Sequence, residues 1–181
     1  MKCPVCKTSY LHSLETEELP QRLVCDTCGG TWIKAFQYWK WLEAHGANLP
    51  EKAEQEGTQL PVTDSTQAKL CPECGHLLTR RQVGHGLDFH IDRCGTCGGI
   101  WFDKNEWEIL KEHNLHDDVH FIFSSAWQHR IVEEQQNKTY EKRIETILGA
   151  GDFAKLKDFK QWILRHPKRN TMMAFLSGLD L

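Results

Sequence analysis

Residues 71–103 begin with Cys71-Pro-Glu-Cys74, continue through a spacer of nineteen residues, and end with Cys94-Gly-Thr-Cys97-Gly-Gly-Ile-Trp-Phe-Asp103. The two Cys-x-x-Cys pairs supply four thiolates, which is the number that a closed tetrahedral structural zinc site uses. Two residues between paired cysteines let the backbone turn so that both sulfurs reach one ion, and the spacer is long enough for a hairpin. This stretch therefore predicts a zinc-bound β-hairpin whose metal has no coordination position left for catalysis.

The predicted zinc ion explains how so short a segment can fold. Ordering about 30 residues costs on the order of 45 kcal/mol at roughly 1.5 kcal/mol per residue. Such a segment buries too little apolar surface to offset that cost alone. A bound zinc ion contributes roughly 10 to 16 kcal/mol. We therefore expect residues 71–103 to be largely unfolded without metal.

The same arrangement occurs earlier in the chain. Residues 3–33 contain Cys3-Pro-Val-Cys6, a spacer of eighteen residues, and Cys25-Asp-Thr-Cys28-Gly-Gly-Thr-Trp-Ile. This repeat disfavours eight free or disulfide-bonded cysteines and predicts two zinc ions, bound by Cys3, Cys6, Cys25 and Cys28 and by Cys71, Cys74, Cys94 and Cys97. One departure is Lys7, which stands where the other three Cys-x-x-Cys turns have glycine. The first turn is therefore predicted to be more strained or exposed.

These motifs resemble a known family. Cys-Pro-x-Cys followed by Cys-x-x-Cys-Gly-Gly-x-Trp-Phe-Asp is similar to the bacterial TFIIB-type (transcription factor) zinc-finger family, named after the zinc ribbon of the eukaryotic initiation factor TFIIB. The resemblance covers two copies, residues 71–108 well and residues 3–33 less completely. The family pattern continues Leu/Phe-Asp-x-Gly-Glu, and only the second copy keeps its acidic part, whereas the first reads Ile33-Lys34-Ala35. The resemblance implies zinc binding and a partner in the transcription or translation machinery.

Composition narrows the class of protein. The chain has 181 residues, of which 40% are apolar, and a net charge of −3. No run approaches the roughly 18 apolar residues that a membrane span needs. Cys3 lies too close to the start for a secretory signal to precede it, so we expect a cytoplasmic protein in a reducing compartment. The sequence has no nucleotide-binding or nucleophile motif, and both metal sites look closed, so neither enzyme activity nor a small-molecule substrate is expected.

The predicted fold class is a small, metal-stabilised α+β protein: two zinc ribbons, each a β-hairpin with metal-binding turns, followed by a helical C-terminal module. The expected domains are 1–46 for the first ribbon and its helix, 47–68 for a linker, 69–118 for the second ribbon and its helix, and 119–181 for the helical module. The sequence leaves open whether the ribbons are flexibly connected or dock on each other. Asp103 and Glu106 have the spacing of a capping box, which predicts that Asp103 caps a helix.

A helix is predicted over residues 33–45. Trp32, Phe36, Trp39 and Leu42 recur at helical spacing and are predicted to form its buried face. Tyr38 and Trp41 fall on other sides, and two more large aromatic residues exceed what one small ribbon can bury. They are predicted either to pack against the second ribbon or the C-terminal helices, or to bind a partner.

Basic residues mark two further candidate surfaces. Arg80 and Arg81 stand together in the second hairpin and, with Arg93, could contact phosphates. The plainer alternative is a solvated hairpin edge. From residue 138 onward, nine basic residues face five acidic ones. This part is predicted to be a small helical bundle that packs on itself or on the ribbons and keeps its lysines solvated. The alternatives are a protein-binding surface or contact with nucleic acid or membrane.

Together these features predict a zinc-binding adapter that acts by protein–protein interaction and has no membrane partner. The first alternative is direct nucleic-acid binding through the second ribbon and the basic C-terminal helices. The second is an electron carrier, because two Cys-x-x-Cys pairs also describe a rubredoxin-like iron site. The spacer lengths and the Gly-Gly-x-Trp motif fit a zinc ribbon better.

Overall fold

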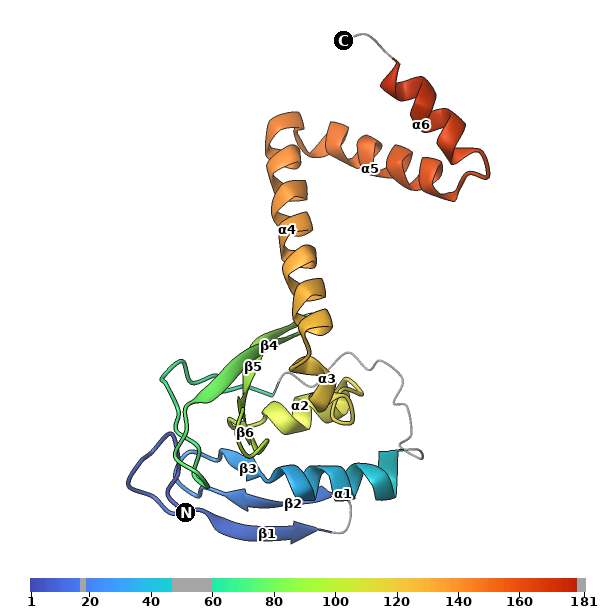
Figure 1. Ribbon diagram of the computed structural model, residues 1–181. Helices are drawn as coiled ribbons and strands as arrows, with labels where there is room; N and C mark the ends of the chain where they lie inside the picture. Colours follow the sequence, from blue (N-terminus) through green and yellow to red (C-terminus); the bar gives the residue numbers. More distant parts are fainter. Residues whose placement is uncertain (17–18, 47–59, 179–181) are drawn as a thin grey trace. The chain divides into compact units, whose positions relative to one another are not determined.

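A β-hairpin forms in each cysteine repeat, and a short third strand follows it. The computed structural model describes residues 1–16, 19–46 and 60–178 (Figure 1). The first ribbon contains β1 (His12–Thr16), β2 (Leu19–Val24) and β3 (Thr31–Ile33), and the second contains β4 (Leu78–Gly84), β5 (Leu87–Cys94) and β6 (Ile100–Phe102). The expected fold class is therefore confirmed in its β part.

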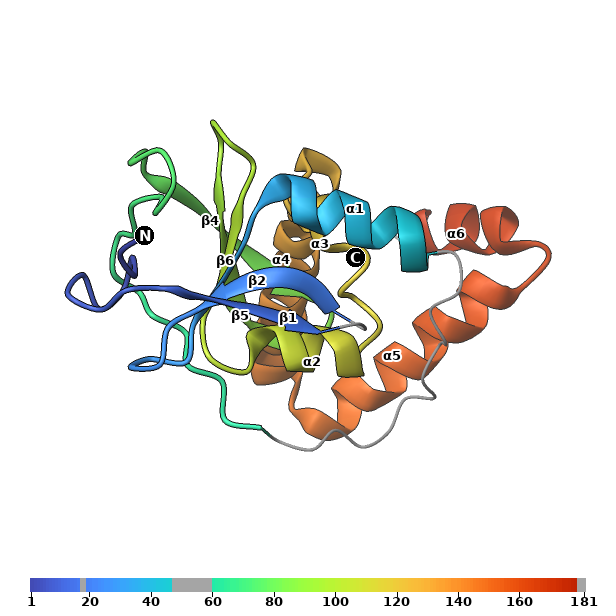
Figure 2. The same ribbon diagram turned by 90° about the horizontal axis from the view of Figure 1, so that it is seen from below.

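The two ribbons join edge to edge into a single sheet. Strands β3 and β6 pair antiparallel with Trp32 opposite Trp101, and the six strands take the order β1-β2-β3-β6-β5-β4. Figure 1 shows the hairpins β1–β2 and β4–β5 at the two ends of this sheet, and Figure 2 shows the sheet from the β1–β2 end. The ribbons therefore dock on each other, which the sequence had left open.

The seam between the ribbons is built from one glycine and one tryptophan of each. The indole of Trp101 lies over Gly30, where an added Cβ atom would stand 2.2 Å from the indole Cζ2. The indole of Trp32 lies over Gly99, where the same distance would be 2.1 Å. Both tryptophans are fully buried. The second glycine of each Gly-Gly-x-Trp motif is thus the space into which the tryptophan of the other ribbon packs.

The two faces of the sheet carry different clusters. One face holds Trp32, Trp101 and the buried cysteines of both ribbons. The other holds the main apolar core, to which the central strands contribute Ile33, Ile100 and Phe102. Because neighbouring residues of a strand point to opposite faces, three consecutive residues of β6 serve both clusters. The metal-binding turns and the helices therefore lie on different sides of one sheet.

Helix α1 (Ala35–His45) follows β3 directly. Tyr38 and Trp41 are its buried residues, with exposures of 1% and 5%, whereas Phe36 and Trp39 are exposed by 70% and 46%. The prediction that Tyr38 and Trp41 bind a partner is therefore wrong, and so is the predicted buried face through Phe36 and Trp39. The helical pattern had included Trp32, but this residue belongs to β3 and lies on the other face of the sheet.

The second ribbon and its helices bury the inner face of α1. The Tyr38 hydroxyl donates a hydrogen bond to the Asp117 carbonyl oxygen at 2.7 Å. The Trp41 ring meets the Trp107 ring edge to face, with 5.7 Å between centroids. Packing against the second ribbon, the alternative for these two aromatic residues, is what the structure shows.

Three helices complete the first unit of the chain, which comprises Met1–Ile131. They are α2 (Glu106–Glu112), α3 (Val119–Ile122) and the first turns of α4 (Ser125–Leu148). Trp127 and Ile131 of α4 pack into the main core, and the Trp127 indole N–H donates to the Val83 carbonyl oxygen at 2.8 Å. These contacts carry the unit past residue 118, where the sequence had placed a domain boundary.

Two expectations around the second ribbon need correction. Asn105, not Asp103, stands at the N-cap of α2, although the Asp103 backbone N–H does donate to the Glu106 carboxylate at 2.8 Å. Of the expected linker, residues 47–59 lie outside the described residues. Residues 60–68 are not a free linker, because Leu60 and Val62 pack against the main core.

The second unit comprises Val132–Leu181 and contains the rest of α4, α5 (Ala150–Arg165) and α6 (Arg169–Ser177). The helical C-terminal module is confirmed, but its helices do not enclose a shared core. Among residues 132–178, Ile163 is the one buried hydrophobic residue, and aromatic residues such as Trp162 and Phe175 are exposed by 54% and 73%. The prediction of a bundle packed on itself is therefore wrong for the described residues.

Candidate metal centres

The four cysteines of the first ribbon converge at one point. The sulfur atoms of Cys3 and Cys28 lie 3.7 Å apart, and those of Cys6 and Cys25 lie 3.9 Å apart. A tetrahedral ion with Zn–S bonds of about 2.3 Å requires sulfurs about 3.8 Å apart. The donor set and its spacing therefore fit zinc, with every coordination position taken by a thiolate.

The second ribbon repeats this geometry. The sulfurs of Cys71 and Cys97 lie 3.5 Å apart, and those of Cys74 and Cys94 lie 3.4 Å apart. Within each ribbon the four sulfurs lie within 4.8 Å of one another. All eight predicted ligands are thus brought together in two groups, and the chain has two zinc sites. A bound zinc ion supplies structural cross-linking here, because no open position remains for a water or substrate.

The backbone of each turn is shaped for the metal. The N–H groups of Cys6, Cys74 and Cys97 point at the sulfur of the first cysteine in their pair, at 3.3 to 3.5 Å. Glycine takes the left-handed conformation after three of the four pairs, with φ between 73° and 77°. Lys7 takes it after the first pair with φ of 64°. A side chain is strained in this region, so the predicted strain of the first turn is confirmed.

Backbone N–H groups favour the thiolate of the third cysteine in each ribbon, Cys25 and Cys94. Burial alone would raise the pKa of Cys94, but the N–H groups of Cys97 and Thr96 stabilise its thiolate and lower the pKa to about 6. In the first ribbon, burial is opposed by the N–H groups of Cys28 and Thr27 together with hydrogen bonds from the Cys3 and Cys28 thiols, and the pKa of Cys25 is lowered to about 7. Burial raises the pKa of Cys3 to about 11, so this thiol gives up its proton only when the metal binds.

A buried ion-pair network lies beside the second metal centre, and sequence reasoning had missed it. The Lys69 ammonium lies 2.6 Å from the Asp92 carboxylate and 3.1 Å from that of Asp103, and the Lys69 side chain is fully buried. Asp103 also accepts hydrogen bonds from the Trp101 indole N–H and the Ser65 backbone N–H, both at 2.7 Å. Asp103 therefore ties the seam tryptophan to residues 60–68, and for this reason it does not cap α2.

Glu106 completes the network in its protonated form. Burial and the neighbouring Asp103 charge raise the pKa of Glu106 to about 10. Burial also raises the pKa of Asp92, an effect that Lys69 opposes. The three carboxyl groups of Asp64, Asp103 and Glu106 come within 4.8 Å of one another. The positive charge of Lys69 and the protonation of Glu106 reduce the repulsion among these buried acidic groups.

Removing the Lys69 charge should destabilise the protein strongly. Lys69→Met leaves Asp92 and Asp103 buried without a cation, which is expected to cost about 3 to 5 kcal/mol of unfolding free energy. Urea unfolding measures this loss, with Lys40→Met on the exposed side of α1 as the matched control. Adding Asp92→Asn to Lys69→Met should recover part of the loss. A Lys69→Met variant as stable as the control would contradict the role given to the network.

The three arginines considered for phosphate contact have different surroundings. The Arg80 guanidinium lies 2.6 Å from the Asp64 carboxylate and also donates to the Ser65 carbonyl oxygen. Arg93 lies over the Phe123 ring, with 5.5 Å to the centroid. Arg81 is exposed. Two of the three arginines considered for phosphate contact are thus already engaged within the fold, and Arg81 is the one left facing solvent.

Exposed aromatic side chains gather on the outer side of α1 and on the neighbouring α3. We call Phe36, Trp39 and Phe121 the aromatic patch; their exposures are 70%, 46% and 52%. His120 links its two halves, with ring centroids 5.0 Å from Trp39 and 4.0 Å from Phe121. A shallow hollow of about 380 Å³ lies along Phe36 and Trp39. Phe36 and Trp39, which the sequence had assigned to the core, are therefore available to a partner.

Comparison with protein families matches residues 2–44 and 70–113 to the model described as "Transcription factor zinc-finger", the TFIIB-type zinc ribbon. Each match spans one cysteine repeat and the helix that follows it, and the C-terminal helices lie outside both. Comparisons with curated proteins and with solved structures found no match. No helix in the described part of the chain combines the length and apolar character needed to cross a membrane.

Proposed function

Residues 2–44 and 70–113 are two copies of the TFIIB-type zinc ribbon, and from this premise we propose that the protein is a non-enzymatic adapter. It acts in the cytoplasm by binding another protein, in the transcription or translation machinery. The closed zinc sites support a structural role for the metal, because four thiolates fill each tetrahedron. The zinc ions then hold a rigid platform rather than a reaction centre.

The observation that carries this proposal is the aromatic patch. Three large aromatic side chains stand exposed on the compact first unit, which also contains the sheet and both metal sites. Aromatic residues are enriched in protein interfaces, where their burial supplies much of the binding energy. Lys40 and Glu43 flank the hollow beside Phe36 and Trp39. An apolar centre with charges at its edge is the usual composition of a protein-binding surface.

A pull-down of the tagged full-length protein from its own cytosol, with and without nuclease, tests the proposal. We expect a defined set of proteins to remain bound after nuclease treatment. The double variant Phe36→Ala/Trp39→Ala should lower their recovery at least about tenfold, since interface aromatic residues each contribute upwards of about 1 kcal/mol. Tyr10→Ala, which removes an aromatic residue 68% exposed elsewhere in the first unit, is the control. Equal recovery from the double variant and the control would reject the aromatic patch.

Nucleic-acid binding is the second candidate, and the exposed Arg81 together with the basic C-terminal helices favours it. Phosphate contacts release counterions, so such binding must weaken steeply as salt rises. An aromatic protein interface should respond little to salt. Recovery of nucleic acid that collapses with nuclease and with moderate salt would favour this candidate over the adapter.

A further inference from the structure

The two ribbons differ at one position that follows the seam tryptophan. In the second ribbon, Asp103 stands two residues after Trp101 and accepts its indole N–H at 2.7 Å. In the first ribbon, Lys34 stands two residues after Trp32. An acceptor is thus replaced by a cation at the equivalent place, in ribbons that otherwise pair symmetrically through these tryptophans.

With lysine in place of this aspartate, the buried indole N–H of Trp32 is left without an acceptor among the described residues. Trp32 is fully buried, and its indole nitrogen has no hydrogen-bond partner among the residues that the structure describes. An unpaired buried N–H costs roughly 1 to 3 kcal/mol, so buried donors nearly always have a partner. The first ribbon therefore contains a donor whose acceptor must come from outside the described chain.

The N-terminus of α1 adds further donors at the same place. Lys34 is the N-cap residue of this eleven-residue helix, which has no side-chain cap and no acidic residue in its first turn. The first N–H groups of a helix lack partners within it and carry partial positive charge, so this end attracts anions. The second ribbon differs again, because α2 has Glu106 and Glu108 in its first turn.

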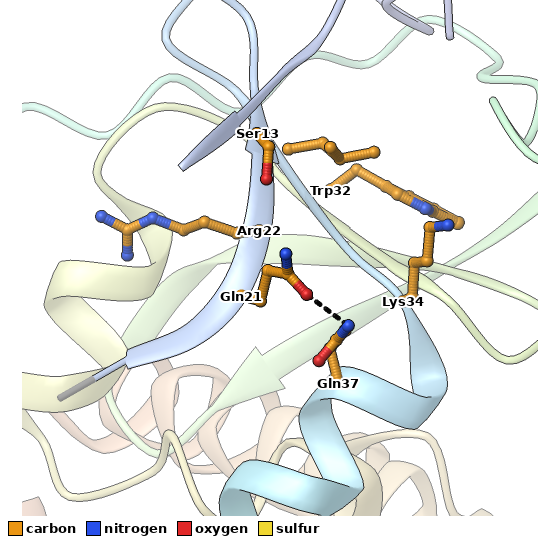
Figure 3. A pocket seen from close by; sticks show the side chains of 7 residues that line it. Ser13, Gln21, Arg22, Trp32, Lys34 and Gln37 are labelled. Atoms are coloured by element: carbon orange, nitrogen blue, oxygen red, sulfur yellow. Dashed lines mark hydrogen bonds between the residues drawn. The ribbon is translucent and has the colours of Figure 1, made fainter. Parts of the chain in front are cut away.

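A small hollow connects these features. Its volume is about 100 Å³, and Ser13, Trp32, Lys34 and Gln37 are among the residues that line it (Figure 3). Figure 3 shows the Lys34 side chain beside the Trp32 indole and the Gln37 amide bonded to that of Gln21, whereas Arg22 points away. The Lys34 ammonium is only loosely held, 3.8 Å from the Glu73 carboxylate, and its side chain is 41% exposed.

We propose that this hollow binds the carboxylate of an acidic side chain presented by the partner protein. The carboxylate accepts the Trp32 indole N–H, pairs with the Lys34 ammonium and caps α1, as the Asp103 carboxylate accepts the Trp101 N–H and pairs with Lys69 in the second ribbon. Lys34 moves aside on its flexible stem to admit the ligand. The protein source of the carboxylate rests on the proposed function, whereas the oxyanion site itself stands on the geometry.

The test follows the indole N–H resonances of the full-length, zinc-loaded, isotope-labelled protein by NMR. The probes are an acetylated hexaglutamate peptide and, separately, inorganic phosphate. We expect the peptide to move the Trp32 resonance downfield in a saturable manner, with a dissociation constant of about 1 to 10 mM for one carboxylate contact. The Trp101 resonance should not move, because its N–H is already bonded to Asp103, and it serves as the internal control.

Variants of Lys34 sharpen the test. Lys34→Met should weaken peptide binding about tenfold or more, whereas Lys40→Met on the same helix should leave it unchanged. Lys34→Asp should supply the acceptor within the chain, moving the Trp32 resonance without any ligand and abolishing peptide binding.

Three other results would each contradict one part of the proposal. Saturation by phosphate alone would overturn the carboxylate ligand, and no saturable shift of the Trp32 resonance with either probe would overturn the site. A pull-down that recovers no protein, together with intact peptide binding, would reject the adapter function while the oxyanion site stands.

Discussion

Replacing Cys94 by serine is expected to unfold the second ribbon and to weaken the first one with it. Cys94 is buried and supplies one of four thiolates to the second zinc site. A structural zinc ion contributes roughly 10 to 16 kcal/mol, which is as large as the whole net stability of a typical domain, about 5 to 15 kcal/mol. Metal analysis should find one zinc ion per chain instead of two, and thermal unfolding should lose its cooperative transition.

The effect should spread because the ribbons share one sheet. Strand β6 of the second ribbon pairs with β3 of the first, so its loss exposes the β3 backbone and the Trp32 ring. Hydrogen exchange at Trp32 and Ile33 should therefore accelerate in Cys94→Ser. Thr96→Ala, an exposed change in the same turn, should keep both zinc ions. A Cys94→Ser variant that keeps two zinc ions and its melting temperature would contradict the metal-dependent fold.

Gly99→Ala is expected to produce the second largest effect, although it adds a single methyl group. That methyl would stand 2.1 Å from Cζ2 of the Trp32 indole, a distance that no packed pair of carbons tolerates. The ring must move within a fully buried seam, and overpacking of this kind costs about 1 to 3 kcal/mol, occasionally more. Gly30→Ala should cost a similar amount, because the Trp101 ring lies over Gly30 in the same way.

Urea unfolding measures this loss, and the chain offers a matched control. An added Cβ at Gly95 meets nothing within 4 Å, so Gly95→Ala should leave stability nearly unchanged. A double-mutant cycle with Trp32→Phe should show that the smaller ring relieves part of the Gly99→Ala penalty, since contacting residues do not act additively. Equal stability of Gly99→Ala and Gly95→Ala would show that the seam is not packed as described.

The metal centres and hairpins were predictable because they depend on local spacing. Two residues between cysteines fix a turn around an ion, and the spacer length fixes a hairpin, so all eight ligands could be assigned from the sequence. The faces of α1 could not be assigned in this way. Trp32 lies next to the helix in sequence and matches its period, but it belongs to a strand, and this shifted the predicted core face away from Tyr38 and Trp41.

The docking of the ribbons and the role of Asp103 required the structure for a different reason. The Gly-Gly-x-Trp motif occurs twice, and the tryptophan of each copy packs over the second glycine of the other copy. The spacing within one copy cannot reveal a contact that needs both copies. Asp103 has the sequence spacing of a helix cap. In the structure its carboxylate instead pairs with the Lys69 ammonium and accepts the Trp101 indole N–H, because both groups are buried beside it. The exposed helices from residue 132 onward carry no cysteine pattern, and the apolar period alone did not reveal that they lack a common core.

In the seam, each ribbon packs its tryptophan against a glycine of the other, so the two ribbons play equivalent parts in this contact. Each ribbon brings one protrusion and one recess, and the antiparallel pairing of β3 with β6 places them in register. These ring-and-glycine contacts do not depend on which ribbon comes first. The connecting segment meets the seam through Ser65, whose backbone N–H donates to the Asp103 carboxylate that also holds the Trp101 indole. A circular permutation that exchanges the order of the two ribbons is therefore expected to preserve this packing, provided that residues 60–69 stay joined to the second ribbon.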